Sequence, residues 1–178
     1  MTVLIVCLIA SPLAAWAAYM VILRRIPTAA MRRAMTAIAD RTGGRNVLAH
    51  GRRPTAKARQ IVMPAPDLIY SSCVFDLSGG PLRFRGPVAE NYWSLSAYAD
   101  NTDNFFVVND LDLGKGEFDV VLIPPGGTTV GIAADRVVEA PSLTGVVLIR
   151  IFIGDGSGLD RIRKMQEASL CEPVPARV

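Results

Sequence analysis

The chain is poor in the residues that most hydrolases and metalloproteins need. Its 178 residues include a single histidine, His50, and three cysteines. Serine–histidine and cysteine–histidine hydrolases need a histidine base beside the nucleophile, and we assign His50 to a basic linker outside the folded domain. Zinc sites need four nitrogen or sulfur ligands, which the cysteines alone cannot provide. We therefore expect neither type of hydrolase, no metal site and no cofactor.

Acidic residues are almost absent from the first third of the chain. Between Arg24 and Arg59, ten basic residues accompany one acidic residue, Asp40, so this segment carries a net charge of +9. Because the whole chain carries +3, the remaining residues carry −6. The pI of about 9.0 therefore describes the basic segment, and we do not expect nucleic-acid binding.

Charge of either sign is missing at the N-terminus. The 22 residues from Thr2 to Leu23 contain no charged side chain. As a helix they would extend about 33 Å, enough to cross the hydrocarbon core of a bilayer. The run therefore predicts a transmembrane helix, in which Pro12 is tolerated. A cleaved signal peptide is the competing interpretation, because Ala15-Trp16-Ala17 resembles a cleavage site, but no positive residue precedes the apolar run.

The basic segment begins with a predicted short helix from Pro27 to Arg41, which Gly43-Gly44 would end. Its apolar residues Met31, Met35 and Ile38 share one face. The helix either lies on anionic lipid headgroups or packs on the domain with its basic face in water. We favour the lipid surface. The arginines expected to contact the headgroups are Arg24, Arg25, Arg32 and Arg33.

The apolar run, the basic segment and the remainder of the sequence divide the chain into three parts. We expect an anchor over residues 1–24, a basic helix and linker over 25–59, and a folded domain over 60–178. Asn46 to Arg59 has no periodicity and is predicted to be an extended linker.

The domain shows short apolar runs between turn signals, which are typical of an all-β sandwich. A short C-terminal helix from Leu159 to Ala168 should follow, with Ser157 as its N-cap, before a proline-rich tail. The predicted strands are Leu68 to Asp76, Leu82 to Arg85, Tyr92 to Ala99, Phe105 to Asn109, Glu117 to Ile123, Thr129 to Ala133, Arg136 to Glu139 and Gly145 to Ile153.

Two loops have a superficial resemblance to ligand loops. The segment from Pro124 to Thr129 lacks the lysine and the helix of a phosphate loop, and we expect a turn. The segment from Asp155 to Asp160 lacks the terminal glutamate of a calcium loop, and we expect a plain loop and helix cap.

A more site-like cluster combines aromatic, carboxyl and amide side chains. Tyr92-Trp93-Ser94 opens one predicted strand and an Asx-rich stretch follows it, and loops at sheet ends often form binding sites. The competing interpretation is a core aromatic and an Asx turn, which we favour. If a ligand site exists, its candidate residues are Asp67, Tyr70, Tyr92, Asp100 and Asn104.

The side of the membrane on which the domain lies stays open on these grounds. The arginines after the span favour the cytoplasm under the positive-inside rule. Cys7 lies inside the span, which leaves Cys73 and Cys171 as a possible pair in an oxidising compartment, or as free thiols.

Several short motifs occur in an order that resembles a known family. They are Pro66-Asp67-Leu68-Ile69-Tyr70-Ser71-Ser72, Asp76-Leu77-Ser78-Gly79-Gly80-Pro81, Tyr92-Trp93-Ser94-Leu95 and Asp103-Asn104-Phe105. Together they resemble the bacterial domain-of-unknown-function family numbered twelve fifty-four, over about Pro66 to Ile153.

This resemblance implies a jelly-roll-like β domain and a place in the short, membrane-anchored branch of that family. It also implies a periplasmic domain held at the inner membrane and a disulfide between Cys73 and Cys171. It supplies no reaction. We therefore expect a non-enzymatic envelope protein that binds a protein partner or is an accessory subunit of a membrane complex. The alternative is a periplasmic domain that binds a ligand or processes carbohydrate or lipid.

Overall fold

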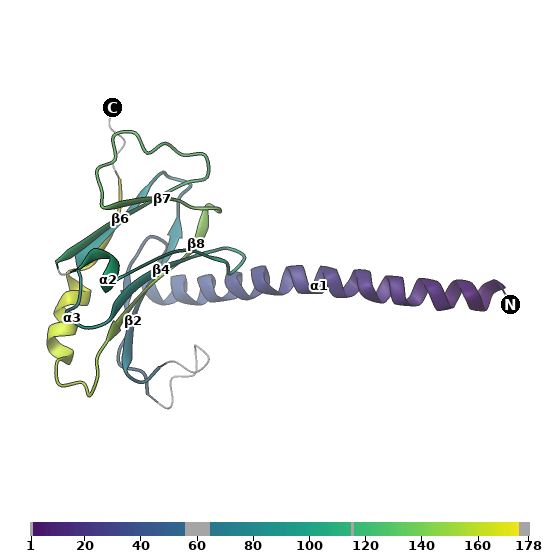
Figure 1. The fold of residues 1–178 in the computed structure, drawn as a ribbon, viewed down its shortest axis with the longest axis horizontal. Coiled ribbons are helices and arrows are strands. Elements are labelled where there is room, and N and C mark those ends of the chain that lie inside the picture. The colour runs from purple at the N-terminus through teal and green to yellow at the C-terminus, as the bar shows by residue number, and fades with distance from the viewer. Residues whose placement is uncertain (1, 56–64, 115, 175–178) are drawn as a thin grey trace.

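A single long helix, α1 (Thr2–Thr42), carries the chain into a β domain and projects well beyond it (Figure 1). The computed structural model describes residues 2–55, 65–114 and 116–174, with the side chains of residues 2–7 and 9 not described. Both Pro12 and Pro27 lie inside the helix. The prediction that a separate helix begins at Pro27 is therefore wrong. A proline costs a helix one backbone hydrogen bond, and here the helix continues through that loss.

The C-terminal end of α1 is closed by two glycines, as predicted. Gly43 has a φ of 80° and Gly44 a φ of 152°. The amide of Gly44 donates to the carbonyl of Ala39 at 3.0 Å, a bond that spans five residues and satisfies a terminal carbonyl of the helix. The chain then turns directly towards the β domain.

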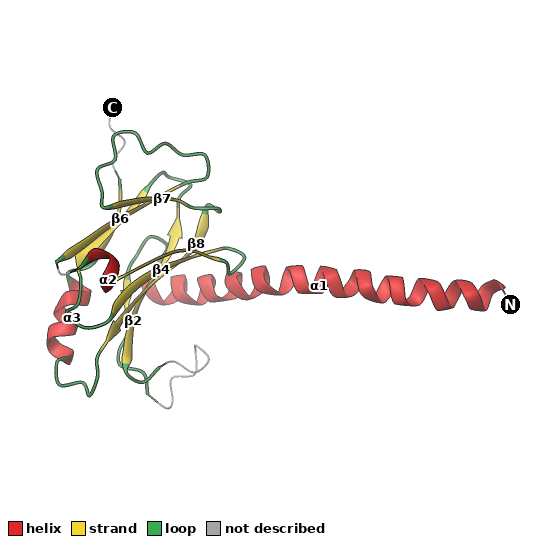
Figure 2. Cartoon of the chain, viewed as in Figure 1, coloured by secondary structure: helices red, strands yellow, loops and turns green. Residues whose placement is uncertain are grey.

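The β domain consists of two sheets, which confirms the prediction of a β fold with a short C-terminal helix (Figure 2). Sheet A has the strand order β1-β2-β8-β4-β5 and sheet B the order β7-β6-β3-β9. All pairs are antiparallel except β6 with β7. The elements are β1 (Ala49–His50), β2 (Leu68–Asp76), β3 (Leu82–Pro87), β4 (Trp93–Ala99), β5 (Asn104–Asn109), α2 (Asp110–Leu113), β6 (Glu117–Ile123), β7 (Arg136–Glu139), β8 (Thr144–Phe152), α3 (Leu159–Glu167) and β9 (Leu170–Pro173).

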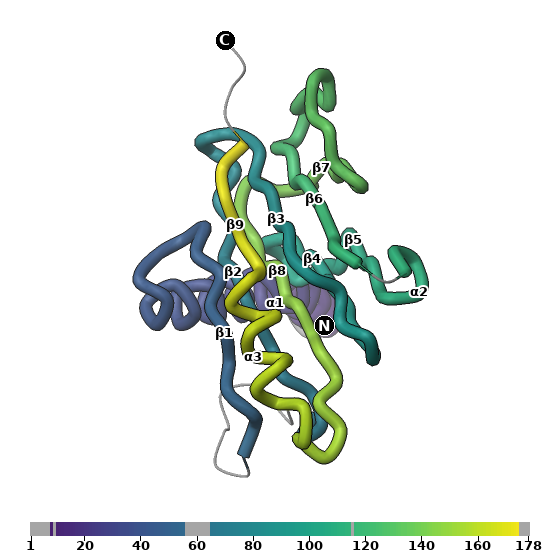
Figure 3. The backbone as a smooth tube through the Cα atoms, turned by 90° about the vertical axis from the view of Figure 1, so that its left-hand side faces the viewer, coloured from purple at the N-terminus to yellow at the C-terminus, as the bar shows by residue number. Residues whose placement is uncertain are grey.

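The core lies between the inner faces of the two sheets. Alternate residues of the central strands point inward, so Ile69 in β2 and Ile149 in β8 are fully buried. Trp93 of sheet A lies 4.7 Å from Phe118 of sheet B, measured between ring centroids. At one end of the sandwich, α3 buries Ile162 and Gln166. The view in Figure 3 is turned so that α1 lies behind the strands and is seen nearly end-on.

The C-terminal part of α1 packs on the outer face of sheet A. Met31 and Met35 are buried against Val74 and Val146, and Tyr98 completes the contact. The apolar face predicted for this helix is therefore real, but it contacts the domain, as in the alternative that we had not favoured. The arginines Arg24, Arg25, Arg32 and Arg33 are exposed.

Three further details correct the expectations drawn from the sequence. The predicted strand from Thr129 to Ala133 is part of the irregular connection between β6 and β7. The predicted linker contains β1, and the proline-rich tail contains β9. The N-cap of α3 is Gly158 rather than Ser157, whose amide is instead bound by the Asp155 carboxylate at 2.9 Å.

The predicted span from Thr2 to Leu23 includes residues whose side chains lie outside those described. Over the part of the chain that can be assessed, no helix combines the length and the apolar character needed to cross a membrane.

Candidate functional site

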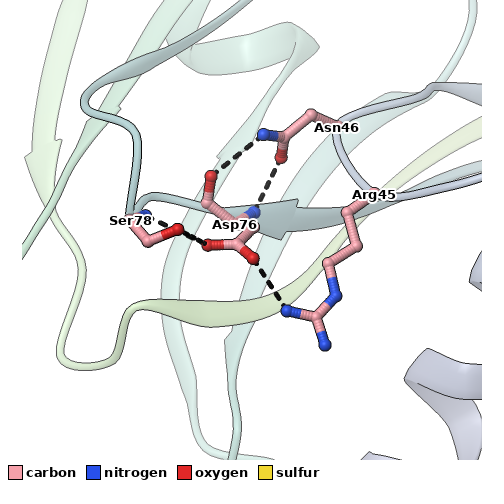
Figure 4. Close-up of polar contacts among 4 residues, drawn as sticks. All are labelled: Arg45, Asn46, Asp76 and Ser78. Atoms are coloured by element: carbon pink, nitrogen blue, oxygen red, sulfur yellow. Dashed lines mark hydrogen bonds and ion pairs between the residues drawn. The ribbon is translucent and has the colours of Figure 1, made fainter.

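The junction between α1 and β2 holds a connected group of polar contacts beside a surface pocket (Figure 4). Asn46, with a φ of 59°, aligns its side-chain amide with the backbone of Asp76. Its Oδ1 accepts the Asp76 amide at 2.7 Å, and its Nδ2 donates to the Asp76 carbonyl at 2.9 Å. The Asn46 side chain therefore pairs with β2 as a neighbouring strand would.

The Asp76 carboxylate binds groups on both sides of the junction. It accepts the Ser78 hydroxyl at 2.6 Å and the Ser78 amide at 3.0 Å. On the other side it accepts from Arg45 Nη1 at 2.7 Å. The bonds from Ser78, followed by the Arg45 guanidinium, lower the pKa of Asp76 below its usual value. The carboxylate is thus held ionised as the centre of the junction.

Beside this group lies an open pocket of about 300 Å³, lined by Arg45, Asn46, Asp76, Ser78, Gly79, Gly80, Pro81, Leu82 and Pro173. The segment from Asp76 to Pro81 is one of the motifs identified in the sequence, and it forms one wall. Most polar atoms of the wall are already hydrogen-bonded to each other, so the hollow is organised mainly as a structural joint.

A serine–histidine contact corrects the assignment of His50 to a solvated linker. His50 lies in β1, and its Nδ1 is 3.0 Å from the hydroxyl of Ser71 in β2. Gln166 Nε2 donates to the same Ser71 oxygen at 2.8 Å, so the Ser71 proton is available to the imidazole. Partial burial lowers the pKa of His50, and Glu167 opposes this effect.

This pair is not arranged as a nucleophile and base. The Ser71 side chain faces the interior, with 2% of the residue exposed. Its oxygen is already engaged by Gln166 and His50, which leaves no approach for a substrate carbonyl. The contact instead fastens β1 and α3 to β2.

The two domain cysteines meet across the sandwich. Cys73 in β2 and Cys171 in β9 place their sulfur atoms 3.3 Å apart as free thiols. The hydrogen bond between them and burial raise the pKa of Cys73 well above its usual value. The disulfide expected from the resemblance is not formed in this structure, although sheet A and sheet B each contribute one of the two neighbouring sulfur atoms.

The five candidate ligand residues do not form one site. Tyr70 and Tyr92 belong to the end of sheet A where β2 begins, and Asp67 immediately precedes that strand. Asp100 follows the other end of β4, and Asn104 opens β5 opposite Tyr98, so both lie near the far end of a seven-residue strand about 23 Å long. Trp93 is core, and the Asn101 Oδ1 that accepts the Asp103 amide makes an Asx turn, as the favoured interpretation had it.

Within the described ranges, no group of three or more histidine, cysteine, aspartate or glutamate residues is placed to hold an ion.

Comparison with known proteins identifies the family. A family model described as "Protein of unknown function (DUF1254)" matches residues 45–173. This chain belongs to the DUF1254 family. The recognition made from the sequence motifs is confirmed, and the matched segment is longer than the motifs alone indicated. It begins at Arg45, so all four residues of the α1–β2 junction lie within the DUF1254 domain.

Solved structures support the fold of this DUF1254 chain. A protein from Vibrio parahaemolyticus, VPA0106, matches with a TM-score of 0.54 and 13% identity over 63% of this chain and 32% of its own. A putative uncharacterized protein from Burkholderia cenocepacia matches with a TM-score of 0.50 and 16% identity over 67% and 35%. The chain spans about a third of the length of each. No curated protein matches it.

The junction predicts a specific loss of stability. Asp76→Ala removes the acceptor of three hydrogen bonds and should lower the free energy of unfolding by about 1–2 kcal/mol. Urea unfolding of the full chain in mild detergent would measure this, with Trp93 fluorescence as the signal in a Trp16→Phe background. Asp135→Ala, at an exposed position of the β6–β7 connection, is the matched control. Equal losses in the two variants would contradict the assigned role of Asp76.

His50 predicts a dependence of stability on pH. Its folded pKa lies below the unfolded value near 6.5, so the unfolded chain binds more protons at acid pH. The contribution of neutral His50 to the stability of the folded state is present above about pH 6.5, and it is lost as the pH falls through the folded pKa of His50. Because His50 is the only histidine, His50→Gln should flatten this part of the curve of unfolding midpoint against pH. An unchanged slope in the variant would refute the assignment.

Proposed function

We propose that this DUF1254 protein is a non-enzymatic, membrane-anchored protein of the bacterial envelope that binds a protein partner or is an accessory subunit of a membrane complex. The observation that carries the proposal is the exposure of the apolar half of α1. Leu8, Leu13 and Trp16 are 66%, 61% and 63% exposed. Tyr19, Val21, Ile22 and Leu23 are also exposed. Apolar side chains on all sides of a helix favour burial in lipid or in a protein assembly.

The contacts at the other end of α1 fix the proposed anchor rigidly to the domain. The helix passes without a break from this apolar half to Met31 and Met35, which pack on sheet A. From Leu23 to Met35 it rises about 18 Å, so the domain would be held close to the headgroups. The inner membrane with a periplasmic domain is the localisation we propose.

Anionic lipid headgroups are a proposed second partner. Arg24 and Arg25 directly follow the apolar run, and Arg32 and Arg33 lie two turns further along α1 on its exposed side. Arginines at this depth attract anionic lipids, each by about 1 kcal/mol. The sequence had suggested that this part of the helix lies flat on the lipid headgroups. In the present proposal it packs on sheet A, and only its exposed arginines face the headgroups.

The domain itself supports a jelly-roll-like classification as part of the proposal. The chain crosses between the two sheets from β2 to β3, from β3 to β4, from β5 to β6, from β7 to β8 and from β8 to β9. Crossings of this kind are typical of double-sheet jelly rolls.

The ligand-binding or carbohydrate- and lipid-processing alternative has less support. It required Asp67, Tyr70, Tyr92, Asp100 and Asn104 to converge, and they lie at two ends of sheet A.

Anchorage predicts where the protein is found after cell fractionation. Leu8→Arg with Leu13→Arg places two charges near the middle of the apolar run, at a cost of about 2.5–3.5 kcal/mol each. The double variant should lose its carbonate-resistant membrane fraction. Val130→Arg, at an exposed apolar position of the β6–β7 connection, should behave as wild type. A double variant that stays in the membrane pellet would argue against the anchor.

Binding of a protein partner is tested with protein from the same membrane fraction. Wild-type protein purified from membranes in mild detergent should retain a stoichiometric protein partner, which mass spectrometry would identify. A monomer free of other proteins would overturn the partner-binding proposal while leaving the anchor intact.

The proposed localisation predicts a disulfide between Cys73 and Cys171. In intact cells of a Cys7→Ser strain, the partly exposed Cys171 thiol should react with a maleimide reagent only after a reductant is added, whereas Cys73 is buried and is not used as the reporter. A disulfide that joins the two sheets should stabilise the domain by about 2–4 kcal/mol, and Cys171→Ser should lose this. Labelling without reductant, but only after the cells are permeabilised, would place the domain in the cytosol and refute the disulfide.

A further inference from the structure

Arg150 lies at the centre of the outer face of sheet A. It is in β8, the middle strand, where Tyr70 of β2 is opposite it on one side and Ser94 of β4 on the other. Directly opposed residues of antiparallel strands point to the same face. Arg150 and Val146 are four residues apart in β8, so this is also the face on which α1 packs, about 13 Å away.

The side chains around Arg150 are polar. A sheet face that packs against another element would be expected to carry apolar side chains at these positions. Arg150 Nη2 donates to the Ser96 hydroxyl at 3.0 Å, and the Tyr92 hydroxyl donates to Ser94 at 3.1 Å. Ser94 and Ser96 are 1% and 0% exposed, whereas Tyr92 is 43% exposed. The two serines thus form a buried polar floor, and Arg150 and Tyr92 lie above it.

The charge of Arg150 is not neutralised within the chain as described. Residues 8–55, 65–114 and 116–174 provide no carboxylate within ion-pair distance of Arg150, although five other arginines have such partners. Its Nε is buried without a hydrogen-bond partner in the same residues. A partly buried guanidinium without an anion is unfavourable, because its desolvation is not offset by a paired charge.

Tyr70 contributes a further donor beside Arg150. Its hydroxyl oxygen accepts the amide of Ala65 at 3.1 Å, which leaves its own proton available. The Arg150 guanidinium and the Tyr70 hydroxyl are therefore the donors available on this face, from the paired strands β8 and β2, while the Tyr92 proton is already donated to Ser94.

We propose that Arg150, with Tyr70, Tyr92 and the Ser94–Ser96 floor, forms a binding site for a single phosphate group. One guanidinium with neutral hydroxyl donors matches one anionic group rather than a polyanion. A phosphate presents oxygen acceptors in several directions, which suits a guanidinium and a hydroxyl that come from two neighbouring strands. The group is supplied either by a soluble phosphate compound or by a phospholipid headgroup. The site follows from the sheet geometry and does not depend on the anchor or on a protein partner.

Titration of the full chain with inorganic phosphate tests the site. In a neutral detergent at constant ionic strength, wild-type protein should give saturable binding in a calorimetric titration. Arg150→Met keeps the aliphatic stem and removes the charge, and it should weaken binding at least ten-fold. Tyr70→Phe, which removes one hydroxyl at an otherwise preserved ring, should weaken it about three-fold. Arg136→Met changes an exposed arginine of sheet B and should have no effect.

Nanodiscs distinguish the two sources of the phosphate group. If the headgroup is the natural ligand, discs of phosphatidylglycerol should suppress the phosphate titration relative to discs of phosphatidylcholine, because the site is already occupied. If the ligand is soluble, the titrations in the two discs should agree. Absence of phosphate binding by wild type, or equal binding by wild type, Arg150→Met and Tyr70→Phe, would overturn the proposal.

Discussion

The pairing of Asn46 with Asp76 is the constraint on which the arrangement of this protein depends. It joins the end of α1 to the end of β2 with two hydrogen bonds between an amide side chain and a backbone. The adjacent packing of Met31 and Met35 on Val74 and Val146 then fixes the direction of the helix. Together the pairing and the packing give the faces of the domain a defined orientation relative to α1.

Because of that orientation, the two sheets differ in what their outer faces carry. Sheet A carries α1 on its outer face and the Arg150 cluster beside it, so its polar chemistry faces the same side as the helix. Sheet B lies on the far side of the core and is joined to sheet A by aromatic packing and by the neighbouring sulfur atoms of Cys73 and Cys171.

The parts of the structure governed by local pattern were predictable, and those governed by distant pairing were not. The bounds of β2, β6 and β7 follow from apolar runs between turn residues, and the Gly43-Gly44 helix end follows from backbone conformation. By contrast, β1 has only two residues and no local strand signal. It forms because Ala49 and His50 pair with Ser72 and Ser71 of β2. Tyr70 and Tyr92 were among the candidates from the sequence, but Arg150 was missed for the same reason, since β2, β8 and β4 come together only through long-range registry. An arginine within an otherwise apolar strand was the available signal.

The strand order of sheet A has a consequence for how the domain is made. In the order β2-β8-β4, the strand that completes both neighbours is the one synthesised last. While the chain emerges, β2 and β4 therefore have their inner edges unpaired until residues 144–152 appear. Such late, non-local closure slows folding and exposes strand edges to aggregation. Insertion of β8 between β2 and β4 is therefore the single step that removes both open edges, so the last central strand to be made decides when sheet A is complete.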